Sequence, residues 1–257
     1  MSPLLPQPFL TTPLAHRALH DRALQRPENS ASAVAAAVSA GYGIEIDLQL
    51  SADGQAMVFH DATLERLTAA TGPVVARDAA ALQALPLTGG SGGEGVPTLR
   101  QVLDLVGGRV PLLIELKDQG SRQGLEAATA AALAGYDGPV AVMSFNPAMV
   151  AAMARLAPQV PRGLTTCAFG PDDFPNPDGD PAREATRRHL AEMTYFAPTG
   201  AAFISHDRRD LENPRVAALR AQGAVVLCWT ITSPEQEAAA RRHAQNITFE
   251  GYLPGFP

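Results

Sequence analysis

Short apolar segments alternate with alanine-rich segments along the whole chain, and this alternation constrains the fold more than any other feature. Segments that alternate in this way are typical of βαβ units and a parallel sheet. A (β/α)8 barrel contains eight such units in roughly 250 residues, and this chain has 257. The sequence therefore predicts an α/β protein with a TIM (β/α)8 barrel, with strands at 13–16, 44–49, 111–116, 139–144, 162–166, 201–205, 224–229 and 246–249.

The segments between the expected strands carry helix start signals. A capping residue followed by proline occurs at 146–147, 213–214 and 233–234. Proline is tolerated there because its missing N–H has no partner in the first turn of a helix. We expect helices at 30–41, 98–106, 123–134, 147–156, 182–193, 214–222 and 234–243.

The connection at about 50–97 is too long for a plain loop between a strand and a helix. It contains another strand candidate at 56–59, so we expect a small insertion on the mouth of the barrel, within one domain that spans residues 1–257. The alternative architecture is an open doubly wound sheet. However, no GxGxxG or GxxxxGK[ST] motif follows the first strand to mark a nucleotide site.

Composition excludes several classes of function. A net charge of −6 and a pI near 5.5 provide no basic field for a nucleic acid. Cys167 and Cys228 lie far apart and form neither a CxxC motif nor a disulfide framework. The first 13 residues do not have the pattern of a signal peptide, and no segment is apolar enough to span a membrane. We therefore expect a cytoplasmic protein without stable membrane association; its oligomeric state is left open.

Two strands carry polar residues in strict alternation with apolar ones. Glu45 and Asp47 share one face of their strand, and Glu115 and Lys117 share one face of the next long strand. A parallel strand is covered on both faces, so neighbouring carboxylates there repel one another unless a cation lies between them. Three carboxylates favour Mg²⁺ or Ca²⁺ over zinc. The alternative interpretation of each pair is an exposed edge strand or a salt bridge.

Two histidines follow expected strands at the face where barrel enzymes build their active sites. His16 ends the first strand, and His60 follows the strand candidate at 56–59. Their imidazoles can accept a proton from a nucleophile and give one to a leaving group. Arg17 and Lys117 offer donors for phosphate oxygens. Trp229, the only tryptophan, either walls a substrate or packs in the core.

These residues lie within an ordered set of motifs that resembles the glycerophosphodiester phosphodiesterase family. The set comprises the motifs at 16–17, 27–30, 43–47, 51–54, 60–61 and 115–117, and further similarity reaches residue 254. The resemblance implies a barrel that hydrolyses glycerophosphodiesters to glycerol 3-phosphate and an alcohol. It departs from the family at Ala18, where glycine is usual, so the extra methyl group is expected to alter the turn or to narrow the approach to phosphate.

Carried over by position, the resemblance implies a divalent metal at Glu45, Asp47 and Glu115. His16 and His60 would form the acid/base pair, and Arg17 and Lys117 would hold the phosphate. Two other functions stay open. One is a lysophospholipase D-like enzyme that acts on lipid phosphodiesters, and the other is a barrel that binds phosphoesters without catalysis.

Overall fold

Eight parallel strands close into a barrel. The structure is a computed structural model that describes residues 3–120 and 123–256. Each strand pairs with the next, and the last pairs with the first through Leu14 and Thr248. All eight predicted strands are confirmed, with ends that move by at most two residues. They are β1 (Leu14–Ala15), β2 (Gly43–Leu50), β4 (Leu112–Leu116), β5 (Val140–Ser144), β6 (Arg162–Thr166), β7 (Phe203–Asp207), β8 (Val225–Ile231) and β9 (Asn246–Phe249).

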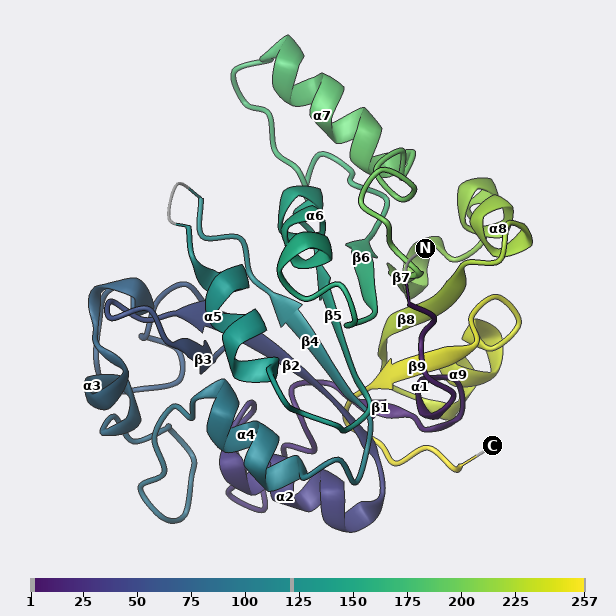
Figure 1. Ribbon diagram of the computed structural model, residues 1–257. Helices are drawn as coiled ribbons and strands as arrows, with labels where there is room; N and C mark the ends of the chain where they lie inside the picture. Colours follow the sequence, from purple (N-terminus) through teal and green to yellow (C-terminus); the bar gives the residue numbers. More distant parts are fainter. Residues whose placement is uncertain (1–2, 121–122, 257) are drawn as a thin grey trace.

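The seven predicted helices are also confirmed, and they lie around the outside of the barrel (Figure 1). Four of them begin with a capping side chain and a proline in the first turn, as at Asn146 and Pro147. The short elements α1 (Pro8–Thr11) and η2 (Arg208–Asp210) were not predicted. The seven helices are α2 (Ala31–Ala40), α4 (Leu99–Val106), α5 (Leu125–Leu133), α6 (Pro147–Leu156), α7 (Pro181–Ala191), α8 (Pro214–Ala221) and α9 (Pro234–Ala240).

Alternation along each strand separates the barrel interior from the layer under the helices. In β4, Leu112 and Ile114 pack in the core cluster that includes α2 and α4, whereas Leu113 packs with residues of other strands inside the barrel. The N-terminal segment contributes Phe9 to this interior cluster, and Asn246 donates from Nδ2 to the carbonyl oxygen of Phe9 at 2.9 Å. The amino end of the barrel is therefore filled with apolar side chains, which leaves the carboxyl ends of the strands for polar groups.

The insertion between β2 and α4 extends the mouth of the barrel. It contains β3 (Ala56–Val58), η1 (Val74–Ala76) and α3 (Ala79–Gln83), so the strand candidate is confirmed. β3 runs antiparallel to the end of β2, and a separate apolar cluster packs beneath it. Phe59 donates from its backbone N–H to the carbonyl oxygen of Asp47 at 2.9 Å. This hydrogen bond places the following residue, His60, beside the end of β2 at the mouth of the barrel.

Candidate active site

Three carboxylates converge at the carboxyl end of the barrel. Glu45 and Asp47 project from β2, and Glu115 projects from β4, where it lies opposite Asp47 in the strand register. The three side chains are almost completely buried, and each offers an oxygen within 4.8 Å of the others. Period-two alternation places them on the inner face of the barrel, as their neighbours Ile44 and Ile46 pack outward.

The buried carboxylates interact strongly with one another. Burial and the charge of Asp47 raise the pKa of Glu45 to about 8, and burial also raises the pKa of Glu115. Burial opposes ionisation of Asp47 as well, but the charges of Lys117, His60 and Arg17 outweigh it, so the pKa of Asp47 is well below its usual range. Such a group of hard oxygen donors, costly to ionise without a cation, is suited to a divalent metal ion.

Lys117 supplies a positive charge to this group. Its Nζ atom lies 2.8 Å from Oδ1 of Asp47 and 2.7 Å from Oε1 of Glu115. These two carboxylates raise the pKa of the ammonium despite its burial, so Lys117 stays charged. The side chain therefore neutralises part of the cluster from within the barrel.

Arg17 approaches the cluster from the loop after β1. Its backbone N–H donates to Oε2 of Glu45 at 3.0 Å, and its Nη1 donates to Oε1 of Glu28 at 2.8 Å. Its Nε atom is buried and has no hydrogen-bond partner among the described residues, although Oδ2 of Asp47 lies 3.7 Å away. Burial of a hydrogen-bond donor without an acceptor is energetically unfavourable. The N–H at Nε is therefore positioned to donate to an anionic oxygen.

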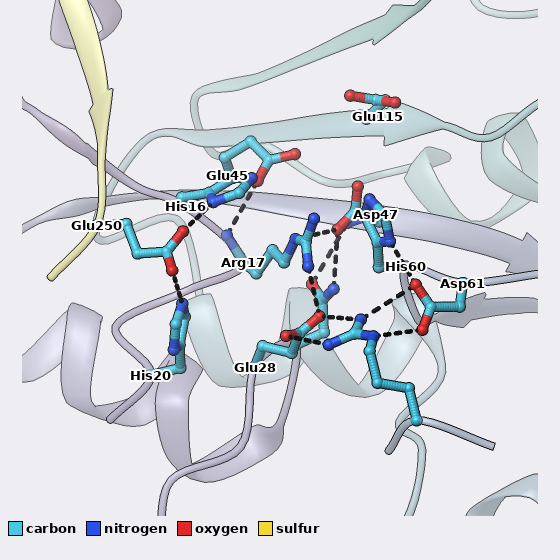
Figure 2. A network of polar contacts seen from close by, with 12 residues as sticks. His16, Arg17, His20, Glu28, Glu45, Asp47, His60, Asp61, Glu115 and Glu250 are labelled. Atoms are coloured by element: carbon cyan, nitrogen blue, oxygen red, sulfur yellow. Dashed lines mark hydrogen bonds and ion pairs between the residues drawn. The ribbon is translucent and has the colours of Figure 1, made fainter. Parts of the chain in front are cut away.

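His16 and His60 lie on either side of Arg17 (Figure 2). Each is bonded through Nδ1 to a carboxylate: His16 to Oε2 of Glu250 at 2.6 Å, and His60 to Oδ1 of Asp61 at 2.7 Å. The pKa of Glu250 falls to about 2, and the pKa of Asp61 is also lowered. Both carboxylates are therefore ionised and accept the hydrogen bond from the imidazole. Each Nδ1 therefore carries the hydrogen, and Nε2 is the nitrogen available for proton transfer.

The two imidazoles differ in their affinity for a proton. Burial lowers the pKa of His16, but the bond to Glu250 and the charges of Glu45 and Asp47 outweigh burial and raise it. Burial also lowers the pKa of His60, and here the nearby cations Lys117 and Arg17 help to keep it below the usual value. The His16 ring therefore binds a proton more tightly than the His60 ring.

Asn29 and Glu250 also form hydrogen bonds to residues of the site. Asn29 donates from Nδ2 to Oδ2 of Asp47 at 2.9 Å, and Ser30, not Asn29, caps α2. Glu250 was not among the predicted site residues, yet it forms a hydrogen bond with His16. Its position directly after the last strand of a closed barrel was the available signal, because that strand pairs with β1.

All eight predicted site residues line one pocket of about 260 Å³ at the mouth of the barrel. Trp229 forms part of its wall, and its indole N–H donates to the carbonyl oxygen of Ser205 at 2.9 Å, which fixes the ring. The remaining seven residues are His16, Arg17, Glu45, Asp47, His60, Glu115 and Lys117. The structure thus brings together residues on or directly after β1, β2, β4 and β8, and one residue of the insertion, in a single cavity.

Ala18 lies outside this pocket. It has a left-handed backbone conformation with a φ of 65°, which explains why glycine suits the position. Its side chain is 2% exposed and packs in the core cluster with α2. The methyl group therefore does not narrow the phosphate approach; it strains the turn instead.

Arg66, from the insertion, forms hydrogen bonds to two carboxylates, one beside Arg17 and one beside His60. It donates to both oxygens of Glu28 at 2.8 and 2.7 Å, and its Nε donates to Oδ2 of Asp61 at 2.5 Å. Glu28 in turn holds Arg17, and Asp61 holds His60. The guanidinium therefore fixes the distance between the Arg17 side chain and the His60 ring.

We expect the substitution Arg66→Ala to lower kcat about tenfold to a hundredfold, because both partners lose their orientation. The side chain is 45% exposed, so the free energy of unfolding should change by less than about 1 kcal/mol. Thermal melting and steady-state kinetics measure the two effects. Arg77→Ala, in the same insertion, is the matched control; an unchanged kcat in Arg66→Ala would show that Arg66 does not position the site.

The sequence of this chain is similar to those of known proteins. The model of the Glycerophosphoryl diester phosphodiesterase family matches residues 16–247. YhdW of Bacillus subtilis is 28% identical over 95% of this chain and 94% of its own. A glycerophosphodiester phosphodiesterase of Caldanaerobacter subterraneus is 33% identical over 54% of this chain and 60% of its own.

Solved structures share the fold. A phosphodiesterase of Oleispira antarctica, determined in complex with the product sn-glycerol-3-phosphate, superposes with a TM-score of 0.75 and 24% identity, covering 94% of this chain and 93% of its own. A glycerophosphodiester phosphodiesterase of Agrobacterium tumefaciens superposes with a TM-score of 0.67 and 25% identity, covering 93% and 96%. Because the family match extends over nearly the whole chain and includes all eight predicted site residues, the chain belongs to the glycerophosphoryl diester phosphodiesterase family.

Proposed function

We propose that this protein hydrolyses glycerophosphodiesters to glycerol 3-phosphate and an alcohol, with a divalent metal ion and two histidines. The observation that carries the proposal is the pair of carboxylate-bound imidazoles, His16 and His60, on either side of Arg17, in one pocket with three buried carboxylates. Binding without catalysis does not require two oriented proton-transfer groups.

The anionic phosphodiester would be held by the cations of the pocket. The buried Nε of Arg17 has no acceptor in the part of the chain that the structure describes, and Lys117 lines the same cavity. Donors fixed before the substrate arrives stabilise the charge that grows on the phosphoryl oxygens without further reorganisation. Asn29 and Arg66 keep the neighbouring carboxylates Asp47 and Glu28 in place.

The metal would be Mg²⁺ or Ca²⁺, held by Glu45, Asp47 and Glu115. When bound, it supplies positive charge that polarises phosphoryl oxygens. The raised pKa of the metal-free Glu45 supports this assignment, since a cation would relieve the repulsion between the buried carboxylates.

The histidines would divide the proton transfers. The nucleophile, whether water or the glycerol hydroxyl, loses a proton as its oxygen bonds to phosphorus, and the departing alcohol oxygen gains one as its bond to phosphorus breaks. The lowered pKa of His60 suits the ring that accepts the first proton, and the raised pKa of His16 suits the ring that donates the second.

The test is release of glycerol 3-phosphate from glycerophosphocholine and glycerophosphoethanolamine by the purified protein. We expect EDTA to abolish activity, and Mg²⁺ or Ca²⁺ to restore it. Full activity after exhaustive chelation would contradict the metal site. Failure to hydrolyse any glycerophosphodiester with either metal would contradict the proposed function.

A further inference from the structure

A second hollow adjoins the catalytic pocket. It has a volume of about 680 Å³, compared with about 260 Å³ for the catalytic pocket, and the two share Phe145 and Trp229 as a common wall. Pockets for drug-sized ligands usually measure roughly 300–1,000 Å³, so the smaller cavity suits only part of a glycerophosphodiester. The larger hollow is the adjoining space where the rest of a substrate can lie.

Apart from Trp229 on β8, the hollow is lined by residues that lie outside the strands. Phe145 and Asn146 follow β5, Phe169 and Phe174 lie in the connection after β6, and Arg183 lies on α7. α7 projects away from the barrel above β6 and α6 (Figure 1), and none of its residues is buried. The outer wall of this hollow therefore comes from a segment that contributes nothing to the barrel core.

Aromatic side chains are concentrated in this hollow. The chain has only nine phenylalanines, four tyrosines and one tryptophan, yet five of these residues line it: Phe145, Phe169, Phe174, Tyr195 and Trp229. The Phe145 ring is nearly perpendicular to Trp229, at 83° and 5.7 Å, and to Phe169, at 86° and 6.2 Å. Rings at right angles present π faces in different directions, an arrangement typical of sites for quaternary ammonium groups.

The charged residues of the hollow agree with a cationic ligand. Asp118 and Asp173 contribute two carboxylates, and Arg183 contributes one positive charge. The guanidinium of Arg183 lies 4.5 Å from the centre of the Phe174 ring, so one ring of this wall already stacks with a cation. An acyl chain would be better matched by aliphatic side chains, which are abundant in this sequence but few in the hollow, where Leu190 is the largest.

We propose that this hollow binds the alcohol half of the substrate and selects an organic cation, a quaternary ammonium alcohol of the choline type. The inference rests on the proposed function for its catalytic half, since the phosphodiester must bridge the two cavities beside Phe145 and Trp229. The aromatic faces contact the cationic methyl groups, and Asp118 and Asp173 balance the charge.

Binding can be tested without catalysis, because Trp229 is the only tryptophan and lines the hollow. We expect choline to change the tryptophan fluorescence of the metal-loaded protein in a saturable way. The uncharged isostere 3,3-dimethylbutanol should bind about tenfold more weakly, since cation–π attraction is lost while shape is kept. Equal affinity for the two compounds, or no response to choline, would overturn the proposal.

Kinetics provide the second test. The value of kcat/KM for glycerophosphocholine should exceed that for its 3,3-dimethylbutyl analogue about tenfold. Phe174→Leu should reduce this ratio severalfold and should lower kcat/KM for glycerophosphocholine more than for glycerophosphoglycerol. Phe256→Leu, at an exposed ring outside the hollow, is the matched control. Hydrolysis of all three substrates at equal rates would reject the subsite but keep the proposed function. A preference for the dimethylbutyl ester or a longer alkyl ester would also reject it, in favour of an apolar alcohol.

Discussion

The substitution His16→Asn is expected to lower kcat on glycerophosphocholine by about 10² to 10⁴, the range that general acid catalysis contributes. Asparagine can still donate to Glu250, so the fold should be kept. The loss should be much smaller on the p-nitrophenyl diester of glycerol 3-phosphate, because a nitrophenolate departs without a proton. Initial rates on the two substrates measure the difference.

The matched variant His60→Asn separates the two roles. If His60 accepts the proton of the nucleophile, this substitution should slow the hydrolysis of both substrates to a similar extent. His243→Asn, away from the pocket, should leave both rates unchanged. Should His60→Asn, and not His16→Asn, be rescued by the nitrophenyl leaving group, the proposed division between the histidines would be reversed. Little effect of either variant would reject two-histidine catalysis.

The substitution Glu45→Gln is expected to change activity and metal-free stability in opposite directions. Activity should fall at least about a hundredfold, because metal ions contribute several kcal/mol to such reactions. Glutamine keeps an oxygen to accept the N–H of Arg17 but removes a buried charge beside Asp47. The metal-free variant should therefore be at least as stable as the wild type at pH 8, as measured by thermal or urea unfolding.

The pH dependence of stability gives the sign of the contribution of Glu45 to the free energy of unfolding. In the metal-free wild type, the pKa of Glu45 is raised to about 8, so between its ordinary value and pH 8 the folded state binds more protons than the unfolded state. The free energy of unfolding contributed by this group therefore falls as the pH rises through that window, and Glu45→Gln should remove this fall. Added metal at 100 times its Kd should stabilise the wild type by about 2.7 kcal/mol and the variant less.

Glu212→Gln, at an exposed glutamate, is the control for the loss of a negative charge. It should leave activity, metal stabilisation and the pH profile unchanged. A marked destabilisation of metal-free Glu45→Gln would contradict the view that the charge of Glu45 is unfavourable in the folded protein until a cation binds. Retained metal stabilisation in that variant would remove Glu45 from the ligand set.

The sequence by itself determined the barrel and the inner face of its polar strands. Alternation with period two predicts that Glu45 and Asp47 point to one side, and the caps followed by proline predict the starts of several helices. These signals are local, because backbone geometry converts spacing along the chain into direction in space. Their success explains why all eight predicted site residues line one pocket, although their roles stay proposals.

Only the tertiary structure decided which groups orient that pocket. Glu250 bonds His16 across 234 residues because closure of the barrel pairs the last strand with the first. Arg66 joins Glu28 and Asp61 because the insertion folds back over the mouth. The aromatic hollow likewise gathers side chains from the connections after β5 and β6 and from α7. No periodicity in the sequence encodes these contacts, since each depends on where distant segments meet when the barrel closes.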